Sequence, residues 1–563
     1  MPLWRLLYPP YGIIIKQNLS RKLVHPPSPK SLPFIGNLIS LPAGPEHIIY
    51  TELGKQLNSD IIYLDLLGND IVVLNSIEAA SDLLDKRSSL YSDRFCPLMF
   101  EDKSLLDWST SPPFLRYNDV WRHQRRMMNK WLNVREVSQF YKMLEDRTRF
   151  LLQHLLAIST ETHPFDGVKD GFFFAMGSSI FQMAYGYTLQ GKSDPFFKAA
   201  HDVDDDALKA LMVTNYYVNV FPILKHVPEW VPGAGWKRSV RELREHKEYA
   251  LDAPFRWTQN QVGVGTNEHS IIGELLQDHH LMSGLNHEER DNRLKELGHA
   301  LYSGGADTTA SLILSFVAAM VLNSDVQSQA QKEIDLVLGP GVLPTIADRG
   351  QLPYINRLIL ELLRWRPALA IGVPHRCLED DVYRGYNITK GTIVIGNLWA
   401  MSRDENIYKE PERFNPDRFL DPGVPPIPAF GWGRRICPGM HFGEASLFIT
   451  IASLLATFTF SKKRDSNGNY IEPIIEDAPN SIVLGLKPFE FELAPRSEMY
   501  RRAINEALQT RALKNTNSSE FGPSYLLDGI VEMGLPANTY GGSRTHGLAG
   551  GWRWHTCKFS QFY

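Results

Sequence analysis

The sequence predicts a single, mainly α-helical domain with small β-sheets, and three observations support this fold class. Helical periodicity dominates from about Arg116 to Leu338. Short runs typical of strands occur at 61–74, 382–400 and 482–493. Neither an internal repeat nor a linker between two cores is evident. A composition of 43% hydrophobic and 22% charged residues excludes a wholly disordered, collagen-like or coiled-coil protein.

Local patterns predict the individual elements. Ile61 to Leu74 holds two β-rich runs on either side of Gly68-Asn69-Asp70, which indicates a hairpin. Glu296 to Asn323 is long and mostly apolar, so we expect a buried helix. The turn Lys390-Gly391 divides the second strand-rich run, and another helix is expected after Pro438.

Charge and cysteine content exclude two classes of protein. The 563-residue chain has 59 Lys and Arg against 63 Asp and Glu, a net charge of -4. A general nucleic-acid binder would need a large basic excess, so no nucleic-acid partner is expected. The cysteines, Cys96, Cys377, Cys437 and Cys557, are far apart and show no pairing pattern. A reducing compartment is therefore favoured over a disulfide-stabilised secreted protein.

Both ends of the chain differ in composition from the globular body, which we place at 34–500. Residues 1–25 are apolar and then basic, but the apolar run is shorter than the roughly 20 residues that span a bilayer. We expect a membrane-associating interfacial segment; the alternatives are a disordered leader or the loss of a longer anchor. Residues 26–33 predict a stiff, proline-rich spacer, and the tail 501–563 is expected to be disordered. The proline-broken apolar segment 221–232 is expected to pack inside or to dip into lipid.

The most informative stretch is a glycine-rich loop, Phe430-Gly-Trp-Gly-Arg-Arg-Ile-Cys-Pro-Gly439. Its glycines let the backbone turn tightly and approach a flat ligand. Backbone N–H groups, that of Gly439 among them, can stabilise a thiolate at Cys437. Zinc would need further ligands, and only His441 is near, while a nucleophilic cysteine would need an activating base. The alternative is a buried structural cysteine in a glycine-rich turn.

The loop reads F-x-x-G-x-R-x-C-x-G and resembles the signature of the cytochrome P-450 superfamily, the haem-thiolate monooxygenases, and especially microsomal fungal members of secondary metabolism. The resemblance implies a cytochrome P-450-type haem-thiolate domain at 34–500 that binds heme b. Cys437 would be the axial ligand of the iron, Phe430 would pack near its sulfur, and Arg435 would meet a haem propionate. A thiolate ligand donates electron density to iron and favours O–O cleavage.

A second stretch, Glu361-Leu-Leu-Arg364, resembles the E-x-x-R helix pattern of the family. Residues at i and i+3 share a helix face. With Arg418, in Phe414-Asn-Pro-Asp-Arg-Phe419, they would form a structural triad of charge-assisted bonds that holds the cysteine loop on the core. Taken alone, such a pair is usually a solvated pair on a helix.

Polar residues and glycines interrupt the long apolar helix at Gly304-Gly-Ala-Asp-Thr-Thr309. Adjacent glycines cost helix stability, and an acid in an apolar helix is costly unless it is hydrogen-bonded or solvated. The family resemblance implies that Asp307 and Thr308 are catalytic and relay protons at the distal face of the haem. A phosphate-binding loop would need a following Lys-Ser/Thr and a preceding strand, which are missing. A kinked structural helix is the remaining alternative.

Three further residues resemble propionate contacts of the family. Trp121-Arg-His-Gln-Arg125 places Trp121 and Arg125 on one helix face. His375, which follows Pro374, is the expected contact on the other side. Singly, each would more often be a surface cation or a satisfied core group.

The expected partners follow from the same resemblance. No flavin or nicotinamide fingerprint occurs in the chain, so electrons are expected from NADPH-cytochrome P-450 reductase. A basic patch of Arg122, Arg126, Lys130 and Arg434 would attract that acidic partner; the alternative is a solvated charge run. The expected location is the cytosolic face of the endoplasmic reticulum membrane.

The expected substrate is a small lipophilic molecule, a terpenoid or another secondary metabolite. The segments at the family's substrate positions are mainly apolar: Phe95–Phe114, Leu301–Ala306, Ala368–Val373 and Pro479–Val483. The predicted reaction inserts one oxygen atom of O2 into the substrate and releases the other as water. The alternatives are a haem-thiolate isomerase or dehydratase, against which the Asp307-Thr308 pair speaks, and a non-catalytic, degenerate ligand-binding copy.

Overall fold

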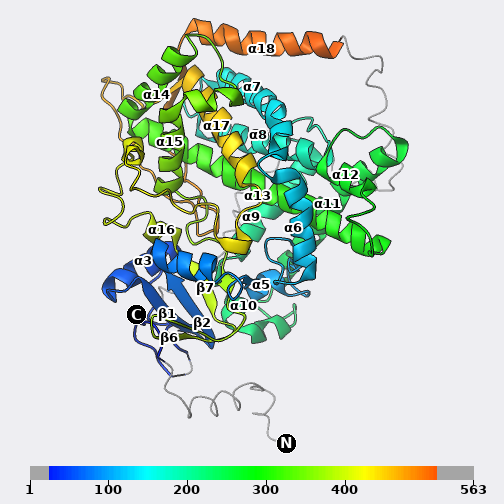
Figure 1. The fold of residues 1–563 in the computed structure, drawn as a ribbon, viewed down its shortest axis with the longest axis vertical. Coiled ribbons are helices and arrows are strands. Elements are labelled where there is room, and N and C mark those ends of the chain that lie inside the picture. Colours follow the sequence, from blue (N-terminus) through cyan, green and yellow to red (C-terminus); the bar gives the residue numbers. More distant parts are fainter. Residues whose placement is uncertain (1–23, 34, 517–563) are drawn as a thin grey trace, which may run out of the picture.

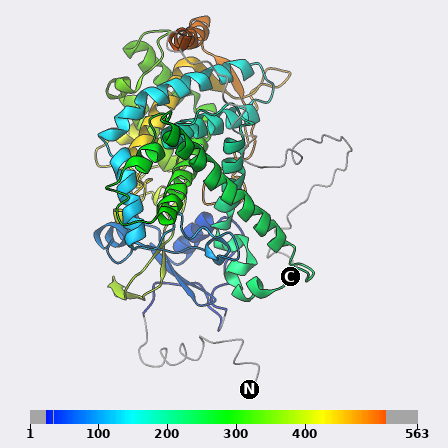
Figure 2. The ribbon, with the colours of Figure 1, turned by 90° about the vertical axis from the view of Figure 1, so that its right-hand side faces the viewer.

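The computed structural model describes residues 24–33 and 35–516. Almost all of the predicted membrane-associating segment and most of the predicted tail therefore lie outside the described residues. Within them, the predicted fold class is confirmed, because helices make up most of the protein and the sheets are small. A helical region lies above a smaller region that contains the main sheet, and a view turned by 90° shows the same two parts (Figure 1 and Figure 2).

The helices differ widely in length, from single turns to one that crosses the whole helical region. Their bounds are α3 (Glu46–Gln56), α4 (Ile77–Ala80), α5 (Leu98–Glu101), α6 (Asp119–Leu132), α7 (Tyr141–Ile158), α8 (Phe165–Tyr185), α9 (Pro195–Ala210), α10 (Tyr217–Val220), α11 (Trp236–Val264), α12 (Ile271–Gln277), α13 (His287–Leu322), α14 (Ser324–Val337), α15 (Pro353–Trp365), α16 (Leu398–Met401), α17 (Met440–Thr457) and α18 (Glu498–Thr516). Short 3-10 turns join several of them, among them η3 (Val213–Asn215), η4 (Pro222–His226) and η7 (Gly433–Arg435).

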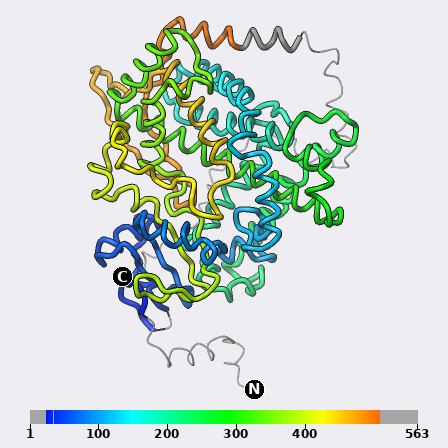
Figure 3. The backbone as a smooth tube through the Cα atoms, in the orientation of Figure 1, coloured from blue at the N-terminus to red at the C-terminus, as the bar shows by residue number. Residues whose placement is uncertain are grey.

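The main sheet joins segments that are far apart in the sequence. Its strand order is β1-β2-β7-β4-β3, with β2 and β7 parallel and the other pairs antiparallel. In Figure 3 the blue segments of the N-terminal part and the yellow-green segments near residue 390 lie side by side in it. The bounds are β1 (Ile61–Leu66), β2 (Asn69–Leu74), β3 (Asp93–Arg94), β4 (His375–Arg376) and β7 (Ile393–Gly396); two hairpin sheets pair β5 (Asp381–Tyr383) with β6 (Tyr386–Ile388) and β8 (Phe458–Ser461) with β9 (Glu492–Pro495).

The hairpin predicted within Ile61 to Leu74 is confirmed as β1 and β2. The two strands leave Leu67 and Gly68 as the turn, and both residues have positive φ, at 52° and 83°. Positive φ is easy for glycine and strained for leucine, so the pairing of the flanking strands holds Leu67 in this conformation. The third strand-rich run was predicted less well, because only Glu492–Pro495 of that region pairs as a strand.

Helix α13 is the central element of the core. It begins at His287, nine residues before the predicted start, because Asn286 and Glu289 form a capping box that satisfies the first free N–H groups. The helix packs against α8 and α17, and its C-terminal half is buried nearly throughout. The predicted helix after Pro438 is present as α17, which is also apolar and buried.

Two helices among the described residues are long and apolar enough to cross a membrane by length and composition, α13 and α17. Their apolar windows are 83% and 78% buried inside the protein. Packing within the domain therefore accounts for their apolar composition.

The start of the predicted disordered tail is helical. Helix α18 runs from Glu498 to Thr516, past the predicted boundary at residue 501. Tyr500 and Ile504 are buried, and the Tyr500 hydroxyl donates a 2.9 Å hydrogen bond to Asp335. Contacts with α7 and α17 thus order a segment whose composition alone does not predict order. Residues 517–563 lie outside the described residues.

Candidate active site

The cysteine loop folds back on itself between Phe430 and the start of α17. The Cys437 N–H group donates a 2.8 Å hydrogen bond to the Phe430 carbonyl oxygen. Gly433 has a φ of 50°, and a Cβ atom there would collide with the Leu84 carbonyl oxygen. The glycine at this position is therefore required both by the backbone conformation and by the close approach of a neighbouring segment.

The Cys437 thiol is surrounded by protein yet keeps accessible surface. Burial raises its pKa, whereas a hydrogen bond from the Gly439 N–H group and the nearby Arg125 guanidinium oppose the rise. The residue nonetheless remains exposed. The sulfur can therefore meet a ligand while most of its environment disfavours a free thiolate.

A buried group of cations lies beside the cysteine loop. Arg435 donates 2.7 Å hydrogen bonds to the carbonyl oxygens of Ser92 and Leu115. Its third nitrogen, Nη1, is buried without a hydrogen-bond partner among the described residues. The guanidinium also lies 4.3 Å from the centre of the Trp121 ring, a cation–π contact.

Three more basic residues, Arg94, Arg125 and His375, belong to this group. Burial and then the positive charge of Arg94 lower the pKa of both Arg435 and His375. Burial also lowers the pKa of Arg125, which is near Cys437. His375 is paired with Arg94 across β3 and β4, and its Nδ1 lies 2.7 Å from the Tyr91 carbonyl oxygen. Burial is the main cause of the lowered pKa values, so an anion beside these groups would stabilise their charged forms.

Arg94 was not among the predicted site residues. It is buried and donates a 2.6 Å hydrogen bond to the Val373 carbonyl oxygen. The local sequence, Ser92-Asp93-Arg94, looks like an ordinary surface segment. Only the pairing of β3 with β4 brings it to His375, so no signal in the sequence could have identified it.

The long helix α13 contributes Asp307 and Thr308. The Thr308 hydroxyl donates a 2.8 Å hydrogen bond to the Gly304 carbonyl oxygen one turn earlier. Gly304 is exposed, and a Cβ atom there would meet nothing within 4 Å. At Gly305, by contrast, a Cβ atom would lie 2.6 Å from the Ile180 Cδ1 atom of α8. The two glycines therefore serve different ends, since Gly305 allows helix packing and Gly304 leaves the helix backbone accessible.

Asp307 is buried and strongly perturbed. Its side chain is 5% exposed, and Oδ1 has no hydrogen-bond partner among the described residues. Burial raises its pKa well above the ordinary value, and the negative charges of Asp204 and Asp205 raise it further. Burial and the nearby carboxylates therefore favour the protonated form of this carboxyl group.

The three residues of the predicted triad meet in the core. Arg364 donates to both carboxylate oxygens of Glu361, at 2.7 and 2.8 Å, and Arg418 donates to the same carboxylate at 3.0 Å. The Asn415 N–H group adds a fourth bond, at 2.8 Å. The carboxylate is fully satisfied, so α15 is locked to the segment that precedes the cysteine loop.

The predicted basic patch is partly neutralised. Arg122 pairs with Asp119 at 2.6 Å, and Lys130 pairs with Asp278 at 2.7 Å. Arg122 and Arg434 both lie against the Tyr117 ring, at 4.7 and 5.5 Å from its centre. The patch therefore has Arg122 and Arg434 together at one end, with Arg126 exposed on the same helix.

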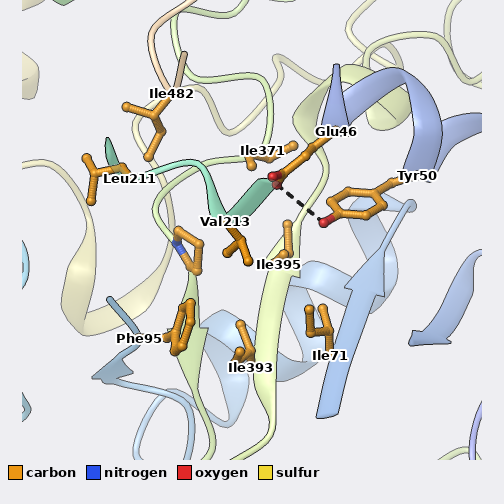
Figure 4. Close-up of a pocket in the computed structure, with 11 residues that line it drawn as sticks. Glu46, Tyr50, Ile71, Phe95, Leu211, Val213, Ile371, Ile393, Ile395 and Ile482 are labelled. Carbon is orange, nitrogen blue, oxygen red and sulfur yellow. Dashed lines mark hydrogen bonds between the residues drawn. The ribbon is translucent and has the colours of Figure 1, made fainter. Parts of the chain in front are cut away.

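An apolar pocket lies between the main sheet, α3 and the end of α9 (Figure 4). Three of the four predicted substrate segments contribute to it, through Phe95, Ile371 and Ile482. Leu301–Ala306 does not line it. The remaining lining residues are Glu46, Tyr50, Ile71, Leu211, Val213, Pro374, Ile393 and Ile395.

Glu46 is the charged group of that pocket, and sequence reasoning missed it. It is buried and accepts hydrogen bonds from Tyr50, at 3.3 Å, and from the Thr214 hydroxyl, at 3.0 Å (Figure 4 shows the first). Burial raises its pKa. An acid directly after Pro45 reads as an ordinary first residue of a helix, so its place in an apolar pocket is evident only in three dimensions.

These features fit a haem group. Cys437 has free surface for an iron atom, and the guanidinium groups of Arg94, Arg125 and Arg435, with His375 beside them, would offer two propionates positive partners. The unpartnered Nη1 of Arg435 supplies a donor for one of them. Gly304 leaves the helix backbone open to a flat ring.

Comparison with known proteins agrees with this assignment. The model of the family "Cytochrome P450" matches residues 26–492. Cytochrome P450 monooxygenase ple1 of Rhodocybe pseudopiperita is 36% identical over 500 residues, covering 85% of this chain and 91% of that protein. Cytochrome P450 monooxygenase COX2 of Coprinopsis cinerea is 33% identical over 507 residues, covering 89% and 94%.

A solved structure shows the same fold. A zebra fish cytochrome P450 bound to abiraterone superposes with a TM-score of 0.64 at 20% sequence identity, covering 80% of this chain and all of that one. The fold, the cysteine loop and the curated relatives agree, and the chain therefore belongs to the cytochrome P450 family as an oxidoreductase, a monooxygenase whose haem iron is bound by a cysteine thiolate.

Proposed function

We propose that Cys437 is the axial ligand of the haem iron and that the surrounding cations hold the propionates. The observation that carries this proposal is an accessible thiol beside a buried cation group with an unpartnered donor, Arg435 Nη1. Gly439 donates to the sulfur. Arg125 and Arg435 would neutralise the propionates, and His375 would become charged only when a propionate beside it raises its pKa. Trp121 holds the Arg435 guanidinium in place.

Other residues keep this loop in position. Phe430 accepts the backbone hydrogen bond of Cys437 and so shapes the turn that presents the sulfur. Glu361, Arg364 and Arg418 anchor the chain before the loop. The haem, when bound, supplies the activation of dioxygen, which an electron-donating thiolate promotes.

Asp307 and Thr308 are the proposed proton-handling pair. Asp307 holds a proton because burial favours its neutral form. The Thr308 hydroxyl is oriented by its bond to Gly304 and presents its oxygen at the accessible side of α13. In this arrangement the Asp307 carboxyl would supply protons, and the Thr308 hydroxyl would direct them to the accessible side of α13.

The overall reaction takes one substrate C–H bond, one O2, NADPH and a proton. It forms a C–OH group, one water and NADP+. The proposed substrate is a small lipophilic molecule, a terpenoid or another secondary metabolite, because the segments Phe95–Phe114, Leu301–Ala306, Ala368–Val373 and Pro479–Val483 are mainly apolar.

We place the reductase on the basic patch and the membrane at the end of the molecule near the main sheet. Exposed apolar side chains of Phe221, Ile223 and Trp230 support the membrane contact, and Trp230 is 83% exposed. They follow α10, which lies at the same end as the described start of the chain (Figure 1). Such side chains suit an interfacial segment, and we propose the cytosolic face of the endoplasmic reticulum.

The first experiment is the difference spectrum of the reduced, carbon monoxide-treated protein. A strongly red-shifted Soret band is expected for the native chain, and Cys437→Ala should lose it completely. Cys377→Ala is the matched control, because Cys377 is buried elsewhere and should leave the band unchanged. A normal thiolate band in Cys437→Ala would refute the ligand assignment.

The second experiment separates the alternatives. Purified protein, reductase and NADPH are incubated with a panel of terpenoids under ¹⁸O2. One labelled oxygen atom per hydroxylated product supports the monooxygenase. Conversion of a peroxide without NADPH would instead identify an isomerase or dehydratase.

A further inference from the structure

Hydrogen bonds join three segments that are far apart in the sequence at one side of the apolar pocket of Figure 4. The segments are α3, η3 and the loop 476–487. Figure 4 shows Glu46 of α3 and Val213 of η3 around the same pocket. Glu46 is 3% exposed, whereas Thr214 and Asn215 of η3 are exposed. The contacts therefore run from the buried pocket to the surface of the protein.

Thr214 is the central residue of these contacts. Its hydroxyl donates a 3.0 Å hydrogen bond to Glu46 Oε1, and its N–H group donates to the same oxygen at 3.3 Å. The side-chain Nδ2 of Asn480 donates to the Thr214 hydroxyl oxygen at 3.3 Å. A hydroxyl group donates one proton and also accepts, so Thr214 holds both partners at once. Glu46 and Asn480 are thereby linked through one side chain.

A second residue of η3 strengthens the link. Asn215 Nδ2 donates to the Asn480 carbonyl oxygen at 2.9 Å, and Asn480 Nδ2 donates to Asn215 Oδ1 at 3.3 Å. Asn215 Nδ2 also donates to the Lys209 carbonyl oxygen near the end of α9, at 2.9 Å. We call Glu46, Thr214, Asn215 and Asn480 the polar junction.

The loop 476–487 carries the predicted substrate segment Pro479–Val483. Two backbone hydrogen bonds close the base of the loop, from Ala478 to Gly485 at 3.0 Å and from Lys487 to Glu476 at 2.9 Å. Ile482 lines the pocket only two residues after Asn480. Since the base is closed, the position of Asn480 constrains that of Ile482.

The same loop contacts a segment that leads to the cysteine loop. The Leu484 N–H group donates a 2.8 Å hydrogen bond to the Ala368 carbonyl oxygen. Four residues further along, a Cβ atom at Gly372 would lie 3.5 Å from the Trp432 ring, which belongs to the cysteine loop. Direct contacts therefore lead from the polar junction to the wall of the candidate active site.

We propose that Glu46 is a positioning residue for substrate binding. It acts through Thr214 and Asn480, and so keeps Ile482 and its neighbours in one place. The inference rests on the proposed function, which assigns the loop 476–487 to the substrate side of the domain. The burial of Glu46 suits this role, because a hydrogen bond is stronger where water does not compete for the acceptor.

Hydrogen–deuterium exchange of the haem-loaded protein tests the link without turnover. Thr214→Val removes the hydroxyl and keeps a side chain of similar shape. Exchange should rise about 5-fold both in 208–219 and in 476–487, the effect of one net hydrogen bond. Tyr50→Phe is the matched control, because it removes only the 3.3 Å bond to the other Glu46 oxygen. Native exchange in 476–487 of Thr214→Val would overturn the proposal.

Two substitutions at Glu46 separate its hydrogen bonds from its volume. Glu46→Gln keeps an oxygen that accepts from Thr214, so exchange in 476–487 should stay close to native. Glu46→Leu fills the same space without an acceptor and should match Thr214→Val. Equal exchange in the two Glu46 variants would show that packing alone holds the loop, and would refute the positioning role.

Ligand binding is the readout for substrate positioning. Clotrimazole and imidazole both coordinate haem iron through a ring nitrogen, but only clotrimazole carries bulky aromatic groups that contact the surrounding walls. In Thr214→Val the Kd of clotrimazole should rise about 5-fold while that of imidazole stays native. Glu52→Gln, at an exposed position of α3, should leave both values unchanged. An unchanged Kd in Thr214→Val, or native protein that binds clotrimazole no more tightly than imidazole, would refute the role.

A double variant tests whether the effect passes through Asn480. Asn480→Ala breaks the link from the loop side, so adding Thr214→Val to it should not raise the Kd of clotrimazole further. Effects that multiply would show two independent contributions and would overturn the proposed route. Asn480→Ala also replaces Thr214→Val in the exchange experiment if the latter does not fold.

The carbon monoxide difference spectrum separates this inference from the proposed function. If the native protein lacks the red-shifted band, the haem-thiolate assignment fails and the positioning role fails with it. If the band is present in the native protein and the variants, but the loop and the Kd of clotrimazole do not respond, only the positioning role is refuted.

Discussion

Burial raises the pKa of the Cys437 thiol, and only one backbone N–H group and one arginine oppose that rise. Metal coordination deprotonates a thiol outright, so formation of the thiolate and binding of iron are coupled at this residue. The cation group instead requires negative charge nearby, because anions would stabilise the charged forms of Arg435 and His375. Haem supplies both, a metal for the sulfur and two carboxylates for the cations.

Asp307 makes the stability of the protein depend on pH. Because its folded pKa is raised above the ordinary 3.8, the folded state binds a proton that the unfolded state releases, and stability falls as pH rises through that window. Asp307→Asn removes this loss of stability at higher pH, because the amide does not ionise. We expect its Tm to match the native Tm below the ordinary pKa and to exceed it increasingly toward neutral pH.

Calorimetry of both proteins across this pH range checks the prediction. Asp205→Asn, at an exposed position, should show a much smaller pH-dependent difference. Equal pH profiles for the native protein and Asp307→Asn would show that the carboxyl group is ionised in the folded state.

Product formation in Asp307→Asn should fall about 100-fold, within the range of a positioned proton donor.

Glu361 compensates two arginines that have almost no access to solvent. In Glu361→Gln, Arg364 and Arg418 remain buried and keep one neutral acceptor, so we expect a loss of about 3–5 kcal/mol in the free energy of unfolding. Denaturant unfolding measures it. The exposed pair of Glu410 and Arg413 is the control, because Glu410→Gln should change stability by less than about 0.5 kcal/mol. A Glu361→Gln variant as stable as the control would contradict the role of the triad as an anchor.

Among the elements, α13 combines two glycines with opposite expectations. Gly305→Ala places a Cβ atom against Ile180 and should destabilise the protein by about 1–3 kcal/mol. In Gly304→Ala the new Cβ atom has no neighbour within 4 Å, so the substitution should raise helix stability by about 0.5–1 kcal/mol. Thermal unfolding of the haem-free proteins compares them directly.

For haem binding, we expect the more harmful substitution to be the one at Gly304 rather than the one at Gly305. Gly304→Ala should weaken haem binding, because the new methyl group occupies the accessible side of the helix, while Gly305→Ala should affect haem binding only through stability. Haem titration followed at the Soret band measures this. Tight haem binding in Gly304→Ala would mean that the ring does not approach this turn of α13.

At the scale of the whole molecule, a net charge of -4 coexists with a local basic patch. Arg126 is exposed on α6 beside Arg122, so Arg126→Glu should raise the reductase concentration for half-maximal activity about 5-fold at low salt, and less at high salt. Lys55→Glu, on α3, is the control with the same charge change. Equal effects of the two variants would show that total charge, rather than this patch, attracts the reductase.

The whole molecule also decides where order ends. Composition predicted a disordered tail from residue 501, yet Tyr500 and Ile504 pack into the core and α18 continues to Thr516. Helix propensity is weak information, and packing of a few apolar side chains overrides it. Conversely, the sequence 482–491 is apolar and β-rich but pairs only through an isolated bridge between Leu486 and Asp477, because a strand needs a partner edge that local sequence does not specify.

Short motifs carried most of what the sequence determined. The cysteine loop, Glu361 with Arg364, and Asp307 with Thr308 were found because their chemistry needs particular residue types at a spacing of a few positions. The predominance of helix, the hairpin at Ile61 to Leu74 and the long central helix followed from periodicity, which is also local.

Tertiary structure alone decided which distant residues complete the site. Arg94 reaches His375 through the pairing of β3 with β4, Glu46 enters an apolar pocket, and Asp204 meets His299 across two helices. None of these residues has a distinctive local pattern, and each looks like an ordinary surface charge in the sequence. Their burial results from the packing of elements about a hundred or more residues apart, and that packing also supplies the desolvation and charge proximity that shift their pKa values or those of their neighbours.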